Sequence, residues 1–184
     1  MRKWTVAVAV AAISLSACGG ERDAVASKQP ETEKAARPAG WDAMDACSTV
    51  GTEAVTKATG KAVTGTALDP KSAPDGLKAG FSMCTFTLTG GAKLTVLTRE
   101  AANGDDYDAA VAAARKLGEE LGSPPVDVQG LGKAAMWTAA PPSLQIFIDD
   151  RRYATISMFG ANFLPDASDE ARAAATTIAQ KLTR

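Results

Sequence analysis

The chain has 184 residues, a formal net charge of −1 and no histidine. This charge balance excludes a basic polyelectrolyte, so nucleic acid is not an expected partner. Because histidine is the commonest general base and the commonest protein metal ligand, its absence argues against an enzyme, and we expect no catalytic residue, no metal and no cofactor.

The N-terminus has the pattern of a secretion signal. Arg2 and Lys3 are basic, and residues 4–15 carry no charge. A membrane span needs about 20 apolar residues, so this run is too short to cross a bilayer but suits the core of a signal peptide. We therefore expect residues 1–17 to be removed on export.

The segment after this run resembles the lipobox of bacterial lipoproteins. It reads Leu15-Ser16-Ala17-Cys18 and is followed by two glycines. The resemblance implies cleavage before Cys18 and attachment of acyl chains such as palmitate to Cys18, which would anchor the protein to a membrane. An ordinary secretory peptide, with Cys18 as a bystander, is the alternative. If the host has two membranes, Gly19 favours the periplasmic side of the outer membrane.

Three parts follow from this pattern. Residues 1–17 are the signal peptide, and residues 18–40 are the lipidated cysteine and a flexible tether. The tether is rich in Ala, Glu, Lys and Pro, and it lacks the apolar content for a core. Residues 41–184 are long enough for one globular domain.

Cys47 and Cys84 are the two cysteines of the domain. Exported compartments are oxidising, so a disulfide between them is the simplest expectation. Two free buried thiols are the alternative.

The first half of the domain predicts a helix followed by a hairpin. Residues 61–80 are polar and rich in Gly, Pro and Asp, which favours loop. Gly90-Gly91 lies between two β-prone runs, which is a hairpin signal. The expected elements are a helix capped by Ser48 and ending at Gly60, a short strand over 63–67, and a hairpin of 81–88 and 93–99.

The second half predicts a helix, a strand group and a final helix. Apolar residues recur at helical spacing before Gly122, and apolar residues alternate over 144–148. The expected elements are a helix from 103 to 122, a strand over 126–139 interrupted at 130–132, strands over 144–149 and 153–159, and a last helix capped by Asp166 or Ser168 and ending near Leu182.

This order predicts an α+β fold with a mostly antiparallel sheet and helices on one face. A helix followed by a β-meander occurs twice, which indicates a weak internal duplication.

The lipobox, the tether and the positions of Cys47 and Cys84 are similar to those of small bacterial lipoproteins of unknown function, as common in actinobacteria. The segment 128–135 and the Ala-rich last helix add to the likeness. The resemblance spans about residues 41–182 and implies an envelope domain with no known catalytic residue.

Three further clusters have a chemical and a structural interpretation. Asp105, Asp106 and Asp108 suit either calcium or, more simply, the start of a helix. The run 149–152 suits either an acid pair with anion-binding arginines or a solvated hairpin turn that protects strand ends. Residues 130–133 lack the full spacing of a phosphate loop, so a bulge or turn is expected.

A candidate binding patch is formed by Phe159, Asn162, Phe163 and Leu164, although core packing explains these residues as well. Trp41 and Trp137 are the other aromatics of interest.

Three functions are considered. The first is a membrane-anchored, non-enzymatic envelope lipoprotein that binds a protein or envelope component. The alternative is a small-molecule or lipid-binding module with a pocket between the sheet and alanine-faced helices; a hydrolase is a weaker third.

Overall fold

The computed structural model describes residues 40–102, 107–160 and 168–184. All of them belong to one compact unit, Ala36–Arg184. No helix in these ranges is both long and apolar enough to cross a membrane.

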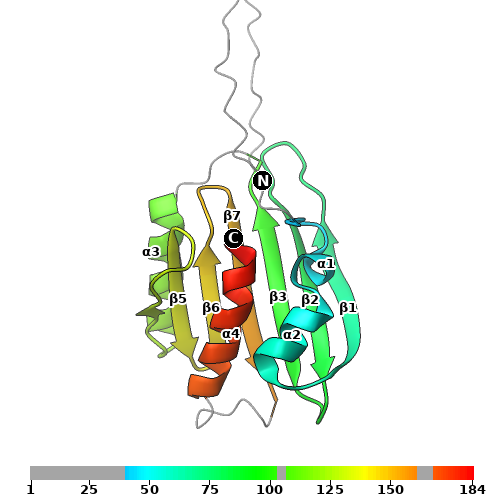
Figure 1. Ribbon diagram of the computed structural model, residues 1–184. Coiled ribbons are helices and arrows are strands. Elements are labelled where there is room, and N and C mark those ends of the chain that lie inside the picture. The colour runs from blue at the N-terminus through cyan, green and yellow to red at the C-terminus, as the bar shows by residue number, and fades with distance from the viewer. Residues whose placement is uncertain (1–39, 103–106, 161–167) are drawn as a thin grey trace, which may run out of the picture. The chain divides into compact units, whose positions relative to one another are not determined.

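A seven-stranded antiparallel sheet organises the described residues (Figure 1). Its strand order is β1-β2-β3-β7-β6-β5-β4, and every neighbouring pair is antiparallel. The α+β class and the antiparallel sheet are therefore confirmed. The elements in chain order are α1 (Ala46–Val50), α2 (Thr52–Thr59), β1 (Val63–Ser72), β2 (Gly80–Leu88), β3 (Lys93–Glu100), α3 (Tyr107–Glu120), β4 (Val126–Asp127), β5 (Ala134–Ala139), β6 (Pro142–Phe147), β7 (Arg152–Phe159) and α4 (Ser168–Leu182).

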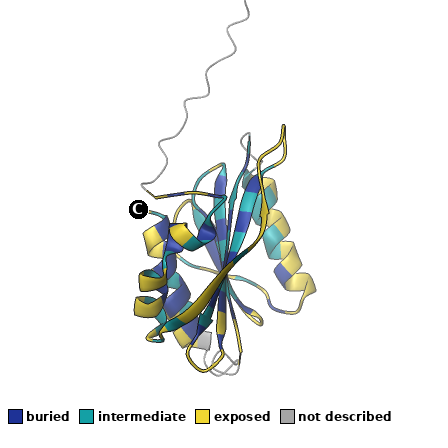
Figure 2. Cartoon of the chain, turned by 90° about the vertical axis from the view of Figure 1, so that its right-hand side faces the viewer, coloured by how far each residue is buried: buried dark blue, intermediate teal, exposed yellow. Residues whose placement is uncertain are grey.

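The helices occupy both faces of the sheet (Figures 1 and 2). The expected helical layer on one face consists of α1, α2 and α4, whereas α3 lies over the opposite face. The physical reason is that Met136 and Phe147 are buried on that opposite face. A single helical layer would have left both side chains in water.

The expected duplication is visible in the strands. The meanders β1-β2-β3 and β5-β6-β7 lie side by side and join at the β3–β7 pair. The preceding helices do not follow the repeat, because α2 and α3 lie on opposite faces (Figure 2). The repeat is therefore limited to the order of the strands and does not include the helices.

The main core lies between the sheet and the layer of α1, α2 and α4. Buried and half-buried residues alternate along β2 and β7, as expected for strands with one well-covered face. Helix α4 contributes four buried alanines, and these small side chains allow it to lie close to the sheet. Large side chains buried in this core include Trp41, Phe86, Leu88, Leu94, Leu131, Trp137, Leu144, Ile146, Ile156, Met158 and Ile178.

The first helical segment begins earlier than predicted and is broken. Asp45 is the N-cap of α1, and its carboxylate accepts hydrogen bonds from the N–H and Oγ of Ser48. These bonds lower the pKa of Asp45. Gly51, with a φ of 76°, separates α1 from α2, so one expected helix is two.

Residues 61–80 contain more strand than predicted. Strand β1 has ten residues, and almost all of them are exposed. The segment is polar because β1 is an edge strand, held mainly by its main-chain pairing with β2. Register shifts on either side of its central residues, near Gly65 and Pro70, interrupt the ladder at an edge that could otherwise recruit another chain.

Helix α1 is tied to the sheet by a disulfide and by buried hydrogen bonds. Cys47 and Cys84 are bonded, with their Cα atoms 5.0 Å apart, so the expected pairing is confirmed. On the buried side of β2, Ser82 Oγ accepts from Ala46 N and donates to Ala43 O, each at 2.9 Å. These contacts fix the start of the domain on the second strand.

Candidate functional site

Helix α3 is held to the sheet at its first turn by an aromatic contact. The ring of Tyr107 meets the ring of Phe147 edge-on, with centroids 5.8 Å apart. Lys133 Nζ lies 4.0 Å from the centroid of the Tyr107 ring, a cation–π distance. The start of α3 is thus fixed between β6 and the segment that precedes β5.

The last turns of α3 are held by a second set of contacts. Gly118 is the buried residue of this helix, and a Cβ there would lie 2.8 Å from Pro125 Cδ and 3.0 Å from Ser123 O. Arg115 Nη2 lies 2.5 Å from the carboxylate of Asp127 in β4. Glycine at 118 therefore allows the chain after α3 to fold back against the helix.

A cavity of about 300 Å³ lies between these two attachments, under α3 and above the sheet. Its helical wall is apolar and small, being formed mainly by alanines and Leu117, whereas a charged turn closes one end. The lining residues are Arg99, Tyr107, Ala110, Ala113, Ala114, Leu117, Gln145, Phe147, Asp149, Asp150, Arg151, Arg152, Tyr153 and Thr155. We refer to this cavity as the α3 pocket.

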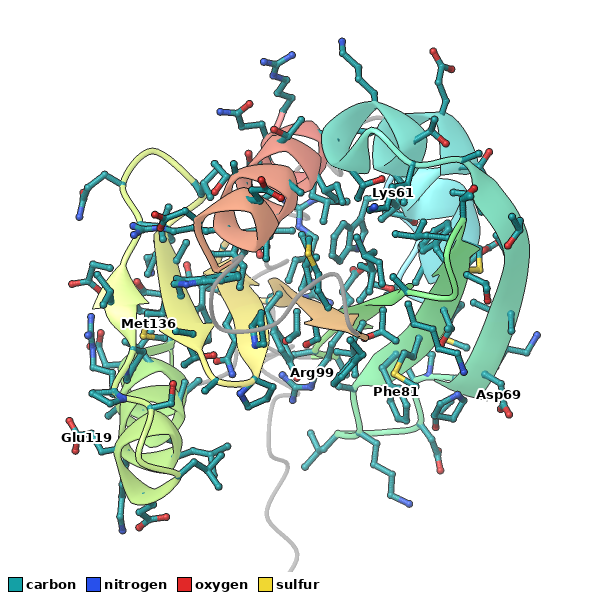
Figure 3. All side chains as sticks on the ribbon, turned by 90° about the horizontal axis from the view of Figure 1, so that it is seen from below. Lys61, Asp69, Phe81, Arg99, Glu119 and Met136 are labelled. Carbon is teal, nitrogen blue, oxygen red and sulfur yellow. A yellow bond between two sulfur atoms is a disulfide. The ribbon has the colours of Figure 1, made fainter. Side chains whose placement is uncertain are left out.

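The floor of the α3 pocket consists of two rows of residues that cross the sheet. Register places Arg99 of β3 opposite Tyr153 of β7, and Tyr153 opposite Phe147 of β6. The next row places Thr155 opposite Gln145. Figure 3 shows Arg99 pointing to the side of the sheet on which α3 lies.

A row of three aromatic rings with a cation at each end runs along one edge of the pocket. The rings of Phe147 and Tyr153 stack with centroids 6.0 Å apart, and the guanidinium carbon of Arg99 lies 5.4 Å from the Tyr153 ring. Together with Lys133 and Tyr107 this makes a continuous row from cation to cation across three strands. We call these five residues the cation–aromatic row.

The charged turn between β6 and β7 is well organised. Asp149 accepts hydrogen bonds from the backbone N–H groups of Arg151 and Arg152 and from Arg152 Nε, at 2.9, 2.8 and 2.6 Å. Burial by itself would raise the pKa of Asp149, but the bonds from Arg152 and Arg151 outweigh it and lower the pKa. Arg152 is buried, and its Nη1 atom has no hydrogen-bond partner among the described residues.

Arg151 is positioned by backbone oxygens. Its Nε and Nη2 donate to Ala101 O at 3.0 and 2.9 Å, and Nη2 also donates to Ala102 O at 2.9 Å. The turn 149–152 is thus both the hairpin turn that the sequence predicts and one end of the pocket.

The Gly130–Gly132 segment is a turn before β5, which agrees with the structural interpretation of the sequence. Gly132 packs against the main chain of β6, because a Cβ there would lie 2.5 Å from Phe147 O. The next residue, Lys133, forms an ion pair with Asp150, and this bond raises the pKa of Lys133. The turn therefore positions Lys133 at one end of the cation–aromatic row.

A second hollow lies between α1, α2 and the end of α4. Its volume is about 610 Å³, but its walls are more polar than those of the α3 pocket and include Lys57, Gln180 and Lys181. Lys181 Nζ already donates to Val50 O at 2.5 Å. The more polar lining makes this hollow a weaker candidate for an apolar ligand than the α3 pocket.

The predicted patch is described in part. Phe159 ends β7 and is 45% exposed, whereas Asn162, Phe163 and Leu164 lie outside the described residues. Cys18, Asp105 and Asp106 also lie outside them.

Structural roles explain three other residues that the sequence singled out: Trp41, Trp137 and Asp108. Trp41 and Trp137 are buried in the core, and Trp41 Nε1 donates to Glu100 Oε2 at 3.2 Å. Asp108 is in the first turn of α3, where its charge complements the helix dipole. Among the described residues, no group of three acidic or cysteine side chains could hold a metal ion.

The sequence predicted a pocket between the sheet and alanine-faced helices but not its position under α3, although a signal for that position was present. Phe147 interrupts the alternation of Leu144, Ile146 and Ile148, and Met136 lies between the apolar residues Ala135 and Trp137. Continuous apolar runs are typical of strands covered on both faces. They could have indicated a helix on the second face.

No protein family, curated protein or solved structure matches this chain. Its function is therefore argued from its own residues.

Proposed function

We propose that this chain is a lipid-anchored, non-enzymatic envelope protein that binds a small, largely apolar molecule in the α3 pocket. The observation that carries the proposal is the cavity of about 300 Å³ between α3 and the sheet. Small-molecule sites have volumes of roughly 300–1,000 Å³ and combine apolar walls with a few polar groups. The alanine wall, the aromatic floor and the charged turn have this composition.

The way α3 is attached supports binding over simple packing. The helix is fixed at Tyr107 and at Gly118, whereas Leu117 is 51% exposed. By contrast, the apolar residues of α4 are buried against the sheet. A helix that stands off its sheet between two fixed ends leaves a preformed space, which reduces the cost of binding.

The anchor rests on the sequence. The lipobox at Cys18 and the tether to residue 40 would hold the domain at a membrane surface. The described chain enters the domain at Trp41, which is bonded to Glu100 next to Arg99 at one end of the pocket. A membrane-derived ligand would thus meet the protein near the end of its tether.

Native mass spectrometry of the protein extracted from its own membranes tests the proposal. We expect an adduct that is lost in Ala114→Phe, because the new ring fills the pocket. Ala112→Phe is the matched control, since Ala112 is exposed on the same helix and does not line the cavity. The bare protein mass under gentle conditions, or an adduct that survives Ala114→Phe, would contradict pocket binding.

Binding of a protein or envelope component is the second candidate. The observation that favours it is a set of exposed apolar side chains near the end of α3, namely Leu117, Leu121 and Val126, which are 51%, 65% and 55% exposed. Crosslinking in whole envelopes should give a product that Leu121→Lys removes. Leu77→Lys is the control, because Leu77 is 84% exposed in a different loop and should leave the product unchanged.

A further inference from the structure

The described lining of the α3 pocket carries more positive than negative charge. Three arginines and two aspartates line it, which gives a local charge of +1. Each aspartate already faces a cation: Asp149 pairs with Arg152, and Asp150 pairs with Lys133. The acids are therefore neutralised within the protein.

Arg151 supplies charge that its own contacts do not neutralise. Its hydrogen bonds go to the carbonyl oxygens of Ala101 and Ala102, which are dipoles without net charge. In the described ranges no carboxylate forms an ion pair with its side chain. Half-buried and fixed in position, this guanidinium can interact with an anion at little cost in side-chain entropy.

Arg99 lies at the same end of the pocket and is also fixed. Its guanidinium is placed over the ring of Tyr153, and both residues line the cavity. The opposite wall consists of Ala110, Ala114 and Leu117, which offer only apolar contact. The pocket is thus polarised, with cations at one end and an apolar wall along its length.

We propose that the ligand is a single-chain anionic amphiphile, whose head binds at Arg99 and Arg151 and whose apolar body lies under α3. This inference rests on the proposed function and specifies its ligand class. The head is a carboxylate or a phosphate, since guanidinium groups recognise both through charge-assisted hydrogen bonds. A cationic amphiphile would meet like charge, and a neutral one would form no charge-assisted hydrogen bond with Arg151.

Calorimetric titration with four ten-carbon probes tests the charge preference. The protein is the processed chain, residues 18–184, with Cys18→Ser so that no acyl chain competes for the site. The probes are decanoate, decyl phosphate, decanol and decyltrimethylammonium. We expect both anions to bind about tenfold or more tightly than decanol, and the cation to bind least. The stronger of the two anions identifies the head group.

Arginine variants assign the preference to the pocket. Arg99→Gln and Arg151→Gln should each weaken decanoate binding about tenfold and leave decanol binding nearly unchanged. Arg99→Lys should retain part of the affinity, and Arg172→Gln on α4 should retain all of it. Arg151→Gln also removes hydrogen bonds to Ala101 and Ala102, so its melting temperature is measured as well. If Arg151→Gln does not fold, the effect of Arg99→Gln on decanoate binding decides the test.

The outcomes separate the two proposals. If no probe binds, pocket binding itself fails. If decanol binds as tightly as decanoate, or if neither arginine variant affects decanoate, the pocket binds apolar molecules but the anionic ligand class is wrong.

Discussion

Gly132 shows how a single residue determines the geometry of the candidate site. Its φ of 56° favours glycine, and it packs so closely on β6 that a Cβ would lie 2.5 Å from Phe147 O. Gly130 also has a positive φ, 79°, but a Cβ there would meet nothing within 4 Å. Substitution of Gly130 therefore tests the backbone conformation alone, whereas substitution of Gly132 also tests the close contact with β6.

We expect Gly130→Ala to lower the free energy of unfolding by about 1 kcal/mol, the cost of the left-handed conformation. Gly132→Ala should cost on the order of 3 kcal/mol, because the main chain of β6 must also move. Urea unfolding of both variants measures the difference. Equal losses would show that the turn does not depend on its contact with Phe147.

Asp149 makes stability dependent on pH in the acid range. Its pKa in the folded state is lowered, against about 3.9 in the unfolded chain. A lowered folded pKa contributes stability above the unfolded pKa, and this stability is lost as pH falls through the folded pKa. We therefore expect unfolding free energy to fall below about pH 4. Without histidine it should stay nearly constant between about pH 5.5 and 8.

Asp149→Asn tests this assignment. The variant should be less stable at neutral pH, because Arg152 loses its buried partner, and its loss of stability between about pH 6 and 3 should be smaller. Asp169→Asn, in the exposed first turn of α4, is the control. An unchanged acid dependence in Asp149→Asn would contradict the role of this carboxylate.

At the scale of elements, the disulfide joins the helical layer to the sheet. It connects α1 to β2 across 37 residues, a loop whose closure is worth about 4 kcal/mol in the chain-entropy model. On reduction we expect α1, α2 and β1 to loosen first, with proteolysis beginning between Lys61 and Gly80. Helix α4 should remain protected by its own buried face. Hydrogen exchange on reduced and oxidised protein measures this order, and uniform loosening would contradict it.

The elements that the sequence predicted well are those with a clear local pattern. The hairpin of β2 and β3 follows from Gly90-Gly91 between β-prone runs, and α4 follows from its apolar stripe. Strand β1 was underestimated because an exposed edge strand has no buried face to give an alternating pattern. The side of the sheet taken by α3 could not be read from α3 itself, since its alanines suit either face.

At the scale of the whole molecule, the α+β class and a pocket beside alanine-faced helices could be predicted, but the position of that pocket under α3 could not. It depends on contacts between segments far apart in the sequence, such as Tyr107 with Phe147 and Arg99 with Tyr153. The interrupted alternation at Phe147 and the continuous apolar run around Met136 were the signals that the second face is covered. The cations gather at one end of the pocket because the strand register brings β3, β6 and β7 together at the turn 149–152.

Membrane anchoring through Cys18 is part of the proposal and is tested separately from ligand binding. We expect Cys18→Ser to abolish lipidation, leaving the protein unprocessed or released, because the thiol is the acceptor that the lipobox implies. Membrane fractionation with labelled palmitate checks both steps, and Cys47→Ser is the control that keeps the label. A Cys18→Ser chain that loses its signal yet stays with membranes would contradict the lipobox interpretation.

The location of the ligand tests the central claim most directly. We would titrate the processed chain with decanoate and record backbone amide shifts and intermolecular NOEs by NMR. The account predicts shifts confined to α3, β3, β6, β7 and the turn 149–152, with NOEs from the alkyl chain to the methyl groups of Ala110 and Ala114. Shifts centred on the hollow between α2 and α4, or no shifts at saturating decanoate, would contradict it.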